Sequence, residues 1–223
     1  MARPVRRRTR HEPRVPSPEG IKTALERFSE GARSILRREL IEDETERFHK
    51  YLILLIKWNN QRKMIGSSNP LWIVENLFLD SLLFFHVVSD TVRALVDIGS
   101  GAGLPGIPMK IIRPDLQVLL VESKQWRASF LKTAVRELRL SDIDVLSDRV
   151  RTAPDAWRKS FDAAVARCAG DSESTIRLGQ EFVRAGGSII LSGPPIPRGI
   201  NVGQYAVVEL PDGTSRRFVV HSP

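Results

Sequence analysis

Apolar positions in the first part of the chain repeat at helical spacing. Three segments follow this pattern, at Ile21–Arg38, Asp43–Asn59 and Trp72–Val88. A stretch that contains glycine and proline, Gly66 to Pro70, separates the second segment from the third. The pattern predicts a helical cap over residues 21–90, whose aromatic side chains serve packing rather than ligand contact.

The pattern changes at Ala94, where short apolar runs begin to alternate with amphipathic segments. Five runs have the length of buried strands: Ala94–Ile98, Gln117–Val121, Ile143–Leu146, Ala163–Ala166 and Ser188–Leu191. The helices predicted between them are Pro105–Ile112, Lys124–Arg139 and Ser172–Arg184. Strands that alternate with helices indicate a parallel sheet covered by helices on both faces.

The last apolar runs predict a different connection. Tyr205–Glu209 and Phe218–Val220 flank a Pro211-Asp212-Gly213 turn, which is typical of an antiparallel hairpin. We therefore predict an α/β fold over residues 91–223, a Rossmann-like sheet with helices on both faces and a C-terminal antiparallel hairpin. This domain follows a disordered basic tail at 1–20 and the helical cap at 21–90.

The composition of the 223 residues is that of a globular protein, with 42% hydrophobic and 27% charged residues. No apolar run reaches the roughly 18–20 residues that cross a bilayer, and the arginine-rich start lacks the apolar core of a secretory signal. The one cysteine, Cys168, excludes an intramolecular disulfide and a multi-cysteine zinc site, and the four histidines are scattered. We expect a cytoplasmic monomer with neither a membrane anchor nor a metal.

The formal net charge of +8 is concentrated at the start of the chain. Residues 1–20 hold six arginines and two glutamates, which gives +4, half of the total. Such a tail can act as a nucleic-acid arm that gains affinity by releasing counterions, or it can simply improve solubility. The rest of the charge favours an anionic substrate.

The candidate chemistry lies directly after the first strand, in a loop with glycine at 99, 101 and 103. Glycines between a strand and a helix permit a tight turn and let a ligand lie against bare backbone. About 20 residues further on, Glu122 ends the second strand, where a carboxylate can accept both hydroxyls of a ribose. These features predict a site for a nucleoside cofactor.

Two cofactors fit this pattern. Gly101, Gly103 and Gly106 satisfy the G-x-G-x-x-G spacing of a nicotinamide dinucleotide site. S-adenosylmethionine is favoured because Asp97 stands two residues before the first glycine, where its carboxylate can reach the amino group of a methionine moiety. The loop is also tighter than a pyrophosphate requires, and a terminal hairpin does not suit an all-parallel dinucleotide sheet.

A longer stretch of sequence resembles one methyltransferase family. The motif at 97–108, DIGSGAGLPGIP, is followed by Arg113-Pro114 and by Val121-Glu122-Ser123. These motifs, the helix at Lys124–Leu140 and the stretch from Phe161 to Ala169 are similar to the GidB family, the bacterial methyltransferases G of small-subunit ribosomal RNA. The resemblance covers about residues 45–220. It implies a Rossmann-like enzyme that methylates N7 of a guanine in small-subunit (16S) ribosomal RNA.

The resemblance also implies site residues by position. The methionine and the ribose would be lined by Gly99, Gly101, Gly103 and Leu104, with Glu122 holding the ribose. Val150 and Arg151 would flank the adenine, and Arg167 would close the site. Arg151 stands where the family usually has Glu, so only a backbone role carries over to it.

The sequence departs from the family pattern in three short segments. The family has Asn-Leu-Thr where this chain has Lys63-Met64-Ile65. Before its Leu-Asp-Ser element the family has Arg-His, and this chain has Asn76-Leu77-Phe78. The family's late Leu-Lys-Gly appears here as Leu191-Ser192-Gly193, without the lysine. We expect all three on the RNA side of the site rather than around the cofactor. On this hypothesis the substrate is ribosomal RNA or a small-subunit particle. Three other functions stay open: a methyltransferase with another acceptor (another RNA, a protein or a small molecule), an NAD-dependent oxidoreductase, and an RNA-binding protein without activity.

Few side chains are candidates for catalysis. Guanine N7 has a free lone pair, so no strong base is required, and positioning can supply up to roughly 7–11 kcal/mol. Arg167 is the candidate catalytic residue, aligning a base or a phosphate, and its alternative role is a surface salt bridge. We interpret Cys168 as a small buried thiol rather than a nucleophile. Lys124 and Arg127 are interpreted as part of a solvated helix face.

Overall fold

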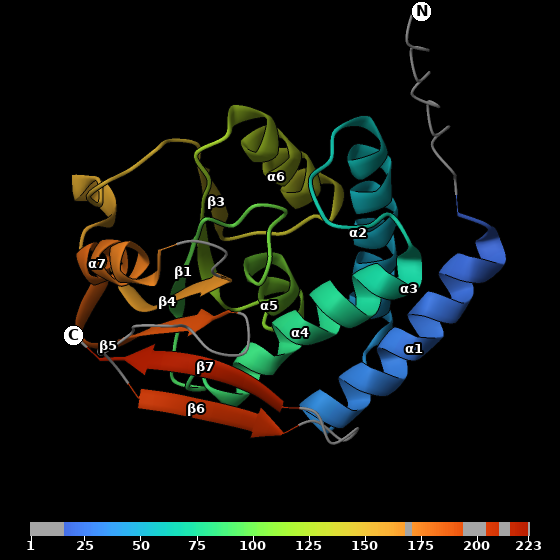
Figure 1. The fold of residues 1–223 in the computed structure, drawn as a ribbon, viewed down its shortest axis with the longest axis horizontal. Coiled ribbons are helices and arrows are strands. Elements are labelled where there is room, and N and C mark those ends of the chain that lie inside the picture. Colours follow the sequence, from blue (N-terminus) through green and yellow to red (C-terminus); the bar gives the residue numbers. More distant parts are fainter. Residues whose placement is uncertain (1–15, 168–170, 194–203, 210–214, 223) are drawn as a thin grey trace, which may run out of the picture.

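The structure is a computed structural model that describes residues 16–167, 171–193, 204–209 and 215–222. Within these residues seven strands form one sheet, in the order β3-β2-β1-β4-β5-β7-β6 (Figure 1). Five strands are parallel: β1 (Ala94–Ile98), β2 (Gln117–Val121), β3 (Ile143–Leu146), β4 (Phe161–Arg167) and β5 (Val183–Ser192). The sheet is completed by β7 (Ser215–His221), antiparallel to β5, and β6 (Gln204–Glu209), antiparallel to β7. The predicted parallel sheet and antiparallel end are both confirmed.

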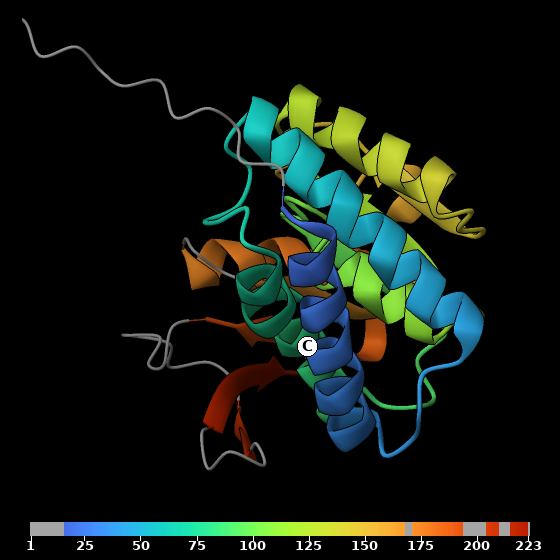
Figure 2. The same ribbon diagram turned by 90° about the vertical axis from the view of Figure 1, so that its right-hand side faces the viewer.

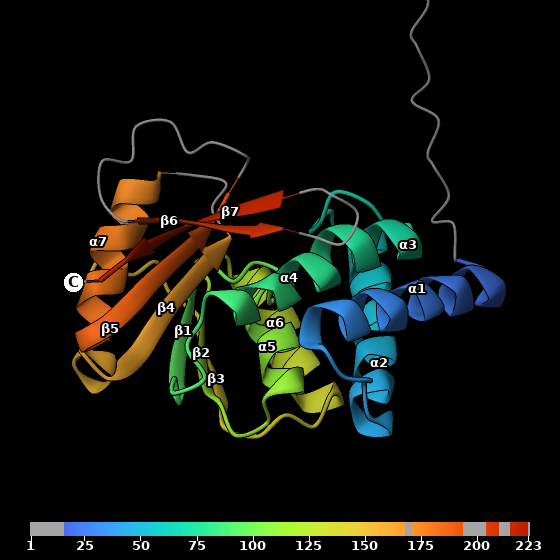
Figure 3. The ribbon, with the colours of Figure 1, turned by 90° about the horizontal axis from the view of Figure 1, so that it is seen from below.

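Helices cover both faces of the sheet, as predicted. On one face lie α5 (Gly106–Ile112), α6 (Gln125–Glu137) and the cap, and on the other lies α7 (Ser172–Phe182), as Figure 3 shows. Alternate residues along β1 belong to two separate cores: Leu95 packs toward the cap and Val96 toward α7. This alternation within apolar strands is what a sheet buried on both sides requires.

The cap begins with two long helices, α1 (Pro18–Leu36) and α2 (Glu42–Gln61), which lie in front of the sheet in Figure 2. The first starts three residues before the predicted Ile21, because the Ser17 hydroxyl accepts the Gly20 N–H at its N-terminus. Four buried aromatic rings, 4.4 to 5.7 Å apart between centroids, fill the space between the cap helices. They are Phe28, Phe48, Tyr51 and Phe78.

The third cap segment differs from the single helix predicted at Trp72–Val88. It consists of α3 (Pro70–Ile73), the π-helical turn η1 (Val74–Leu79), α4 (Asp80–Leu82) and the 3₁₀ turn η2 (Leu83–His86). A π turn takes in one more residue than an α turn, and such turns often occur at functional sites. Here the carbonyl of Asn76, within the π turn, accepts a hydrogen bond of 3.0 Å from the Arg167 side chain.

The end of α7 also differs from the prediction. The helix was expected to run to Arg184, with a strand from Ser188, but it ends at Phe182 and β5 begins at once at Val183. Val183 pairs with Phe161, the register then shifts, and Gly186 takes a φ of +78° within the irregular part. The short turn η3 (Asp155–Trp157) precedes β4. The disordered tail predicted at 1–20 is wrong at its end, because Pro18, Glu19 and Gly20 belong to α1. Residues 1–15, Cys168 and the Pro211-Asp212-Gly213 turn lie outside the described residues.

The strand order fixes where a ligand can bind. After β1 the chain moves toward α5 on one face, and after β4 it moves toward α7 on the other face. Because these two neighbouring strands send their connections to opposite faces, their carboxyl ends leave a crevice at a switch point of the topology. The glycine loop that follows β1 lies at this point.

Tyr51 ties the cap to that loop. Its ring is fully buried, and its hydroxyl donates a hydrogen bond to the Ala102 carbonyl. We expect Tyr51→Phe to lower the free energy of unfolding by about 1–3 kcal/mol, because the buried carbonyl loses its partner. Urea unfolding measures this change. Ile53→Ala, at an exposed position of the same helix, is the control and should change stability by roughly 0.5 kcal/mol at most; equal losses in both variants would contradict the prediction.

Candidate active site

The glycine loop presents bare backbone to open space at two of its three glycines. Gly99, Gly101 and Gly103 have φ angles of +72°, +60° and +88°, which other residues rarely adopt. A Cβ added to Gly99 would meet no atom within 4 Å, and one on Gly101 would come no closer than 3.8 Å to any atom. Gly103 serves packing instead, because its Cβ would lie 2.4 Å from a side-chain carbon of Ile107.

Glu122, at the end of β2, holds the loop in place. One carboxylate oxygen accepts the Gly101 N–H at 3.0 Å, and the other accepts the Lys124 N–H at 2.7 Å. The residue is 4% exposed. Each carboxylate oxygen can accept a second hydrogen bond, so acceptor capacity remains beside the loop.

Asp97 lies beneath the loop and is fully buried. Its Oδ2 accepts the Gly106 N–H at 2.9 Å, whereas its Oδ1 has no hydrogen-bond partner among the described residues. Burial raises the pKa of this carboxyl from 3.8 to about 7, although the Gly106 N–H and the charge of Arg167 act in the opposite direction. Gly106 must lack a side chain here, since a Cβ would lie 2.8 Å from Asp97 Oδ2.

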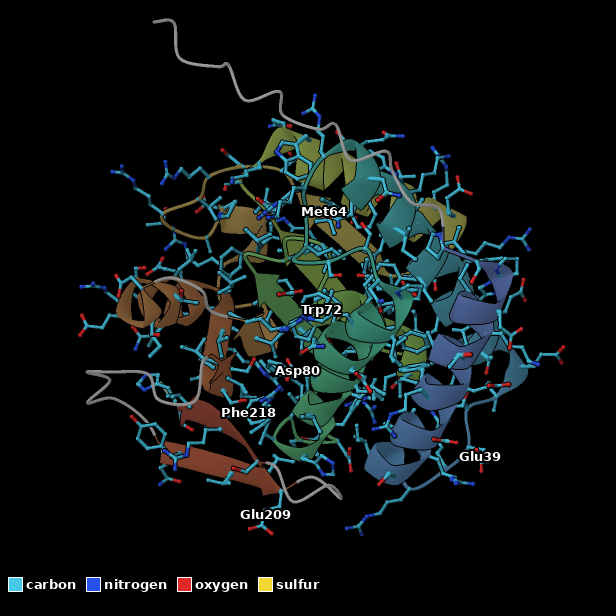
Figure 4. All side chains as sticks on the ribbon, turned by 45° about the vertical axis from the view of Figure 1, so that its right-hand side comes forward. Glu39, Met64, Trp72, Asp80, Glu209 and Phe218 are labelled. Atoms are coloured by element: carbon cyan, nitrogen blue, oxygen red, sulfur yellow. The ribbon has the colours of Figure 1, made fainter. Side chains whose placement is uncertain are left out.

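A cleft of about 880 Å³ opens above the loop. Its floor is the end of β1 and the glycine loop: Ile98, Gly99, Ser100, Gly101, Ala102 and Leu104. Residues of the cap form the facing wall: Met64, Ile65, Trp72, Asn76, Leu77 and Asp80. Figure 4 shows Met64, Trp72 and Asp80 following one another along this side of the molecule. Four arginines, Arg127, Arg167, Arg216 and Arg217, also line the cleft.

A second cavity of about 510 Å³ lies on the other side of Ile98. It is lined by Val150, Arg151 and residues of α7, and it shares Ile98 and Thr175 with the cleft. The two cavities therefore adjoin at the carboxyl end of β1, where the strand order predicts a ligand. Together they offer more room than the roughly 300–1,000 Å³ of one ordinary small-molecule site.

An ion-pair network joins three parts of the fold at the edge of the cleft. The Asp80 carboxylate pairs with two arginines: its Oδ2 lies 3.2 Å from Arg167 Nη2, and its Oδ1 lies 2.7 Å from Arg216 Nε. These ion pairs link the cap to β4 and β7. The Asp80 side chain is 12% exposed, so these pairs are partly shielded from solvent. Arg167 is thus both a salt-bridge partner and a residue of the cleft.

The structure gathers the predicted site residues in two places. Gly99, Gly101, Leu104 and Arg167 line the cleft, and Val150 and Arg151 line the adjoining cavity. Asp97, Gly103 and Glu122 line neither and lie beneath the loop surface. All three segments that depart from the family pattern contribute to the cleft, through Met64, Ile65, Asn76, Leu77, Ser192 and Gly193.

The interpretation of Arg127 was wrong, and the prediction missed cleft residues, among them Trp72, Asp80, Arg216 and Arg217. Arg127 is not on a solvated face: its side chain is 26% exposed, lines the cleft and lies 3.9 Å from Glu122, and its buried Nε has no partner among the described residues. Asp80 and Arg216 were not selected, because their pairing depends on contacts between residues 136 positions apart. Their polar character alone gives no signal of a site.

The residues present fit an adenosylmethionine-type cofactor. A cradle that a Cβ would fill at Gly99 and Gly101, an unpaired buried carboxylate oxygen on Asp97 and free acceptor capacity on Glu122 offer partners for a methionine amino group and a ribose. The antiparallel β7 next to β5 differs from an all-parallel dinucleotide sheet. None of the described helices could span a membrane, and no cluster of metal-binding side chains is found among the described residues.

The sheet order, the glycine loop and the acidic end of β2 define a Rossmann-like, S-adenosylmethionine-dependent methyltransferase. The family model of rRNA small subunit methyltransferase G, GidB, matches residues 44–193, and the chain belongs to this family. A ribosomal RNA small subunit methyltransferase G of Xanthomonas campestris pv. campestris (strain 8004) is 34% identical over 183 residues, 77% of this chain and 84% of that protein. One of Chromobacterium violaceum is 31% identical over 194 residues, 83% and 91% of the two chains.

A solved structure supports the fold. TYW2 of P. horikoshii, in complex with MeSAdo, superposes with a TM-score of 0.52 at 12% identity, over 72% of this chain and 66% of that one. At this identity the likeness shows the fold alone.

The buried carboxyl of Asp97 makes stability depend on pH. Since its pKa is raised in the folded state, the folded protein binds this proton more tightly than the unfolded chain, and the contribution of Asp97 to the free energy of unfolding falls as pH rises from about 4 to about 7. Asp97→Asn removes this slope, so its stability relative to the unsubstituted protein should rise across that window by at most about 1.4 kcal/mol per pH unit. Urea unfolding at a series of pH values measures the difference, and parallel curves for the two proteins would show that the group titrates normally.

Proposed function

We propose that this protein transfers the methyl group of S-adenosylmethionine to N7 of a guanine in small-subunit ribosomal RNA. The family to which the chain belongs supports this acceptor. The observation that carries the proposal is the set of four arginines around a cleft whose floor is the glycine loop. Guanidinium groups bind phosphates and base edges, and here they surround the place where a methyl donor would lie. Such a substrate is found in the cytoplasm.

Each part of the site would then have one task. The loop at Gly99 and Gly101 would carry the methionine and the ribose, Glu122 would accept the ribose hydroxyls and Asp97 the amino group. Val150 and Arg151 would flank the adenine in the adjoining cavity. Arg167, fixed by Asp80, would orient the acceptor nucleotide.

The reaction requires alignment rather than acid–base chemistry. The cofactor supplies an electrophilic methyl group on a positively charged sulfur. The guanine N7 lone pair would take this methyl group as its bond to sulfur breaks, sulfur would keep the electron pair of that bond, and the positive charge would pass to the base. Because no proton is transferred in this step, a cleft that holds the two reactants in line can supply most of the acceleration.

Transfer of a labelled methyl group to ribosomal RNA tests the proposal directly. The substrate is small-subunit RNA, naked or in a partial particle, from cells that lack this modification. We expect one labelled guanine that is methylated at N7, identified by nuclease digestion and mass spectrometry. Transfer to small molecules or proteins only would refute the RNA assignment, and binding of NADH in preference to adenosylmethionine would refute the cofactor.

The glycine loop offers a matched pair of variants. Gly101→Ala and Gly186→Ala each place a Cβ at a positive φ with no atom closer than 3.8 Å, so both should carry a similar backbone strain of about 1 kcal/mol. Only the first methyl group would occupy the cradle of the cofactor. We expect Gly101→Ala to weaken adenosylmethionine binding at least tenfold (about 1.4 kcal/mol) in a calorimetric titration, and Gly186→Ala to leave it unchanged. Equal affinities for the two variants would argue against the loop as the cofactor site.

A further inference from the structure

The cap wall of the cleft is largely apolar, although it faces a rim of arginines. Met64, Ile65, Trp72 and Leu77 supply this wall, opposite the glycine loop. Trp72 is the one aromatic residue among those lining the cleft. It is partly buried, and Asp80 lies two helical turns further along the same segment. An aromatic ring beside guanidinium groups is the combination with which proteins hold an unstacked nucleotide: the ring takes the base and the cations take the phosphates.

The backbone of Trp72 and one side of its ring are held in place. The backbone N–H of Trp72 donates to the Asn69 side chain at 3.0 Å, which caps the first turn of α3. A Cβ added to Gly66 would lie 3.0 Å from Cη2 of the Trp72 ring, so the ring packs against the Gly66 backbone. The position of the ring is therefore set before any ligand arrives, which reduces the entropy lost on binding.

The neighbouring apolar residues are fixed by a single side chain. Asn59, near the end of α2, accepts the Met64 and Ile65 N–H groups at 2.7 and 2.9 Å and donates to Ser68 at 2.9 Å. This side chain shapes the loop between α2 and α3 and holds Met64 and Ile65 next to Trp72 at the cleft. This part of the cap therefore forms a defined surface in the absence of a ligand.

We propose that Trp72, supported by Met64 and Ile65, is the stacking surface for the acceptor base, and that Arg127, Arg167 and Arg216 take the flanking phosphates. This inference rests on the proposed function, because it assigns the RNA-binding half of the same site. A base extruded from its RNA can lie flat on the ring, with its edge toward the donor above the glycine loop. Methylation leaves the base positively charged, and the face of an indole ring attracts a cation more strongly than other side-chain rings do.

Kinetics with the methyl-transfer assay test the stacking surface. We expect Trp72→Ala to lower kcat/KM for ribosomal RNA about tenfold or more, since base–aromatic stacking is worth roughly that factor, and to leave the affinity for adenosylmethionine unchanged. Trp72→Phe keeps a ring and should lose less than about threefold. Leu71→Ala, at the exposed neighbouring position outside the cleft, is the matched control and should behave as the unsubstituted protein.

Fluorescence gives a readout that does not depend on catalysis. Guanosine 5′-monophosphate, added to the protein with S-adenosylhomocysteine, should quench tryptophan emission in the unsubstituted protein and not in Trp72→Phe, which retains the other three tryptophans. Equal quenching in both proteins, or none in either, would overturn the stacking surface. So would unaltered RNA kinetics in Trp72→Ala.

The two proposals fail in different ways. If the unsubstituted protein binds adenosylmethionine but methylates no ribosomal RNA, the acceptor is wrong. If it methylates ribosomal RNA and Trp72→Ala matches it with full cofactor affinity, only the role of Trp72 is wrong. A loss of adenosylmethionine affinity in Trp72→Ala would also count against the stacking surface, because it would place Trp72 on the cofactor side.

Discussion

The site depends on a glycine loop that is held from two directions. From the sheet, the Glu122 carboxylate accepts the Gly101 N–H, and from the cap, the Tyr51 hydroxyl donates to the Ala102 carbonyl. A loop of glycines has little preference of its own, so contacts from outside must select one conformation. Because one of these contacts comes from a helix about fifty positions earlier, the cap is a structural part of the proposed cofactor site and not an accessory to it.

The cap also completes the other side of the cleft. The sheet contributes the loop after β1 and Arg167 at the end of β4, which lie at the switch point of the strand order. The cap contributes an apolar wall and Asp80, whose carboxylate binds one arginine from β4 and one from β7. Two chemically different surfaces thus face each other: bare glycine backbone with two buried carboxylates beneath it, and an apolar wall with one tryptophan, edged by guanidinium groups.

The parts of the fold that depend on neighbouring residues could be predicted from the sequence. The strands around β1, the glycine loop and Glu122 could be predicted because apolar runs, glycines and an acid follow one another within thirty residues. The break of the third cap helix could not, since the π turn contains no glycine or proline and its Asn76 carbonyl accepts a hydrogen bond from Arg167, far along the chain. The role of Asp80 could not be predicted for the same reason, since both of its arginine partners lie far along the chain. Arg127 was assigned to a solvated helix face because the sequence does not show that this face borders the cleft.

The π turn at Val74–Leu79 has a consequence for how chain length can vary in this family. Successive residues of an α-helix are set about 100° apart around the axis, so one residue inserted into a regular helix before Asp80 would rotate its carboxylate away from both arginines. The wide turn takes up one additional residue without that rotation, and Asp80 keeps its two partners. A homologous chain with one residue fewer in this segment would form a regular α-helix here and would keep its acid opposite the same partners. A one-residue gap at this place in an alignment would therefore mark a change of helix type with the ion-pair network intact.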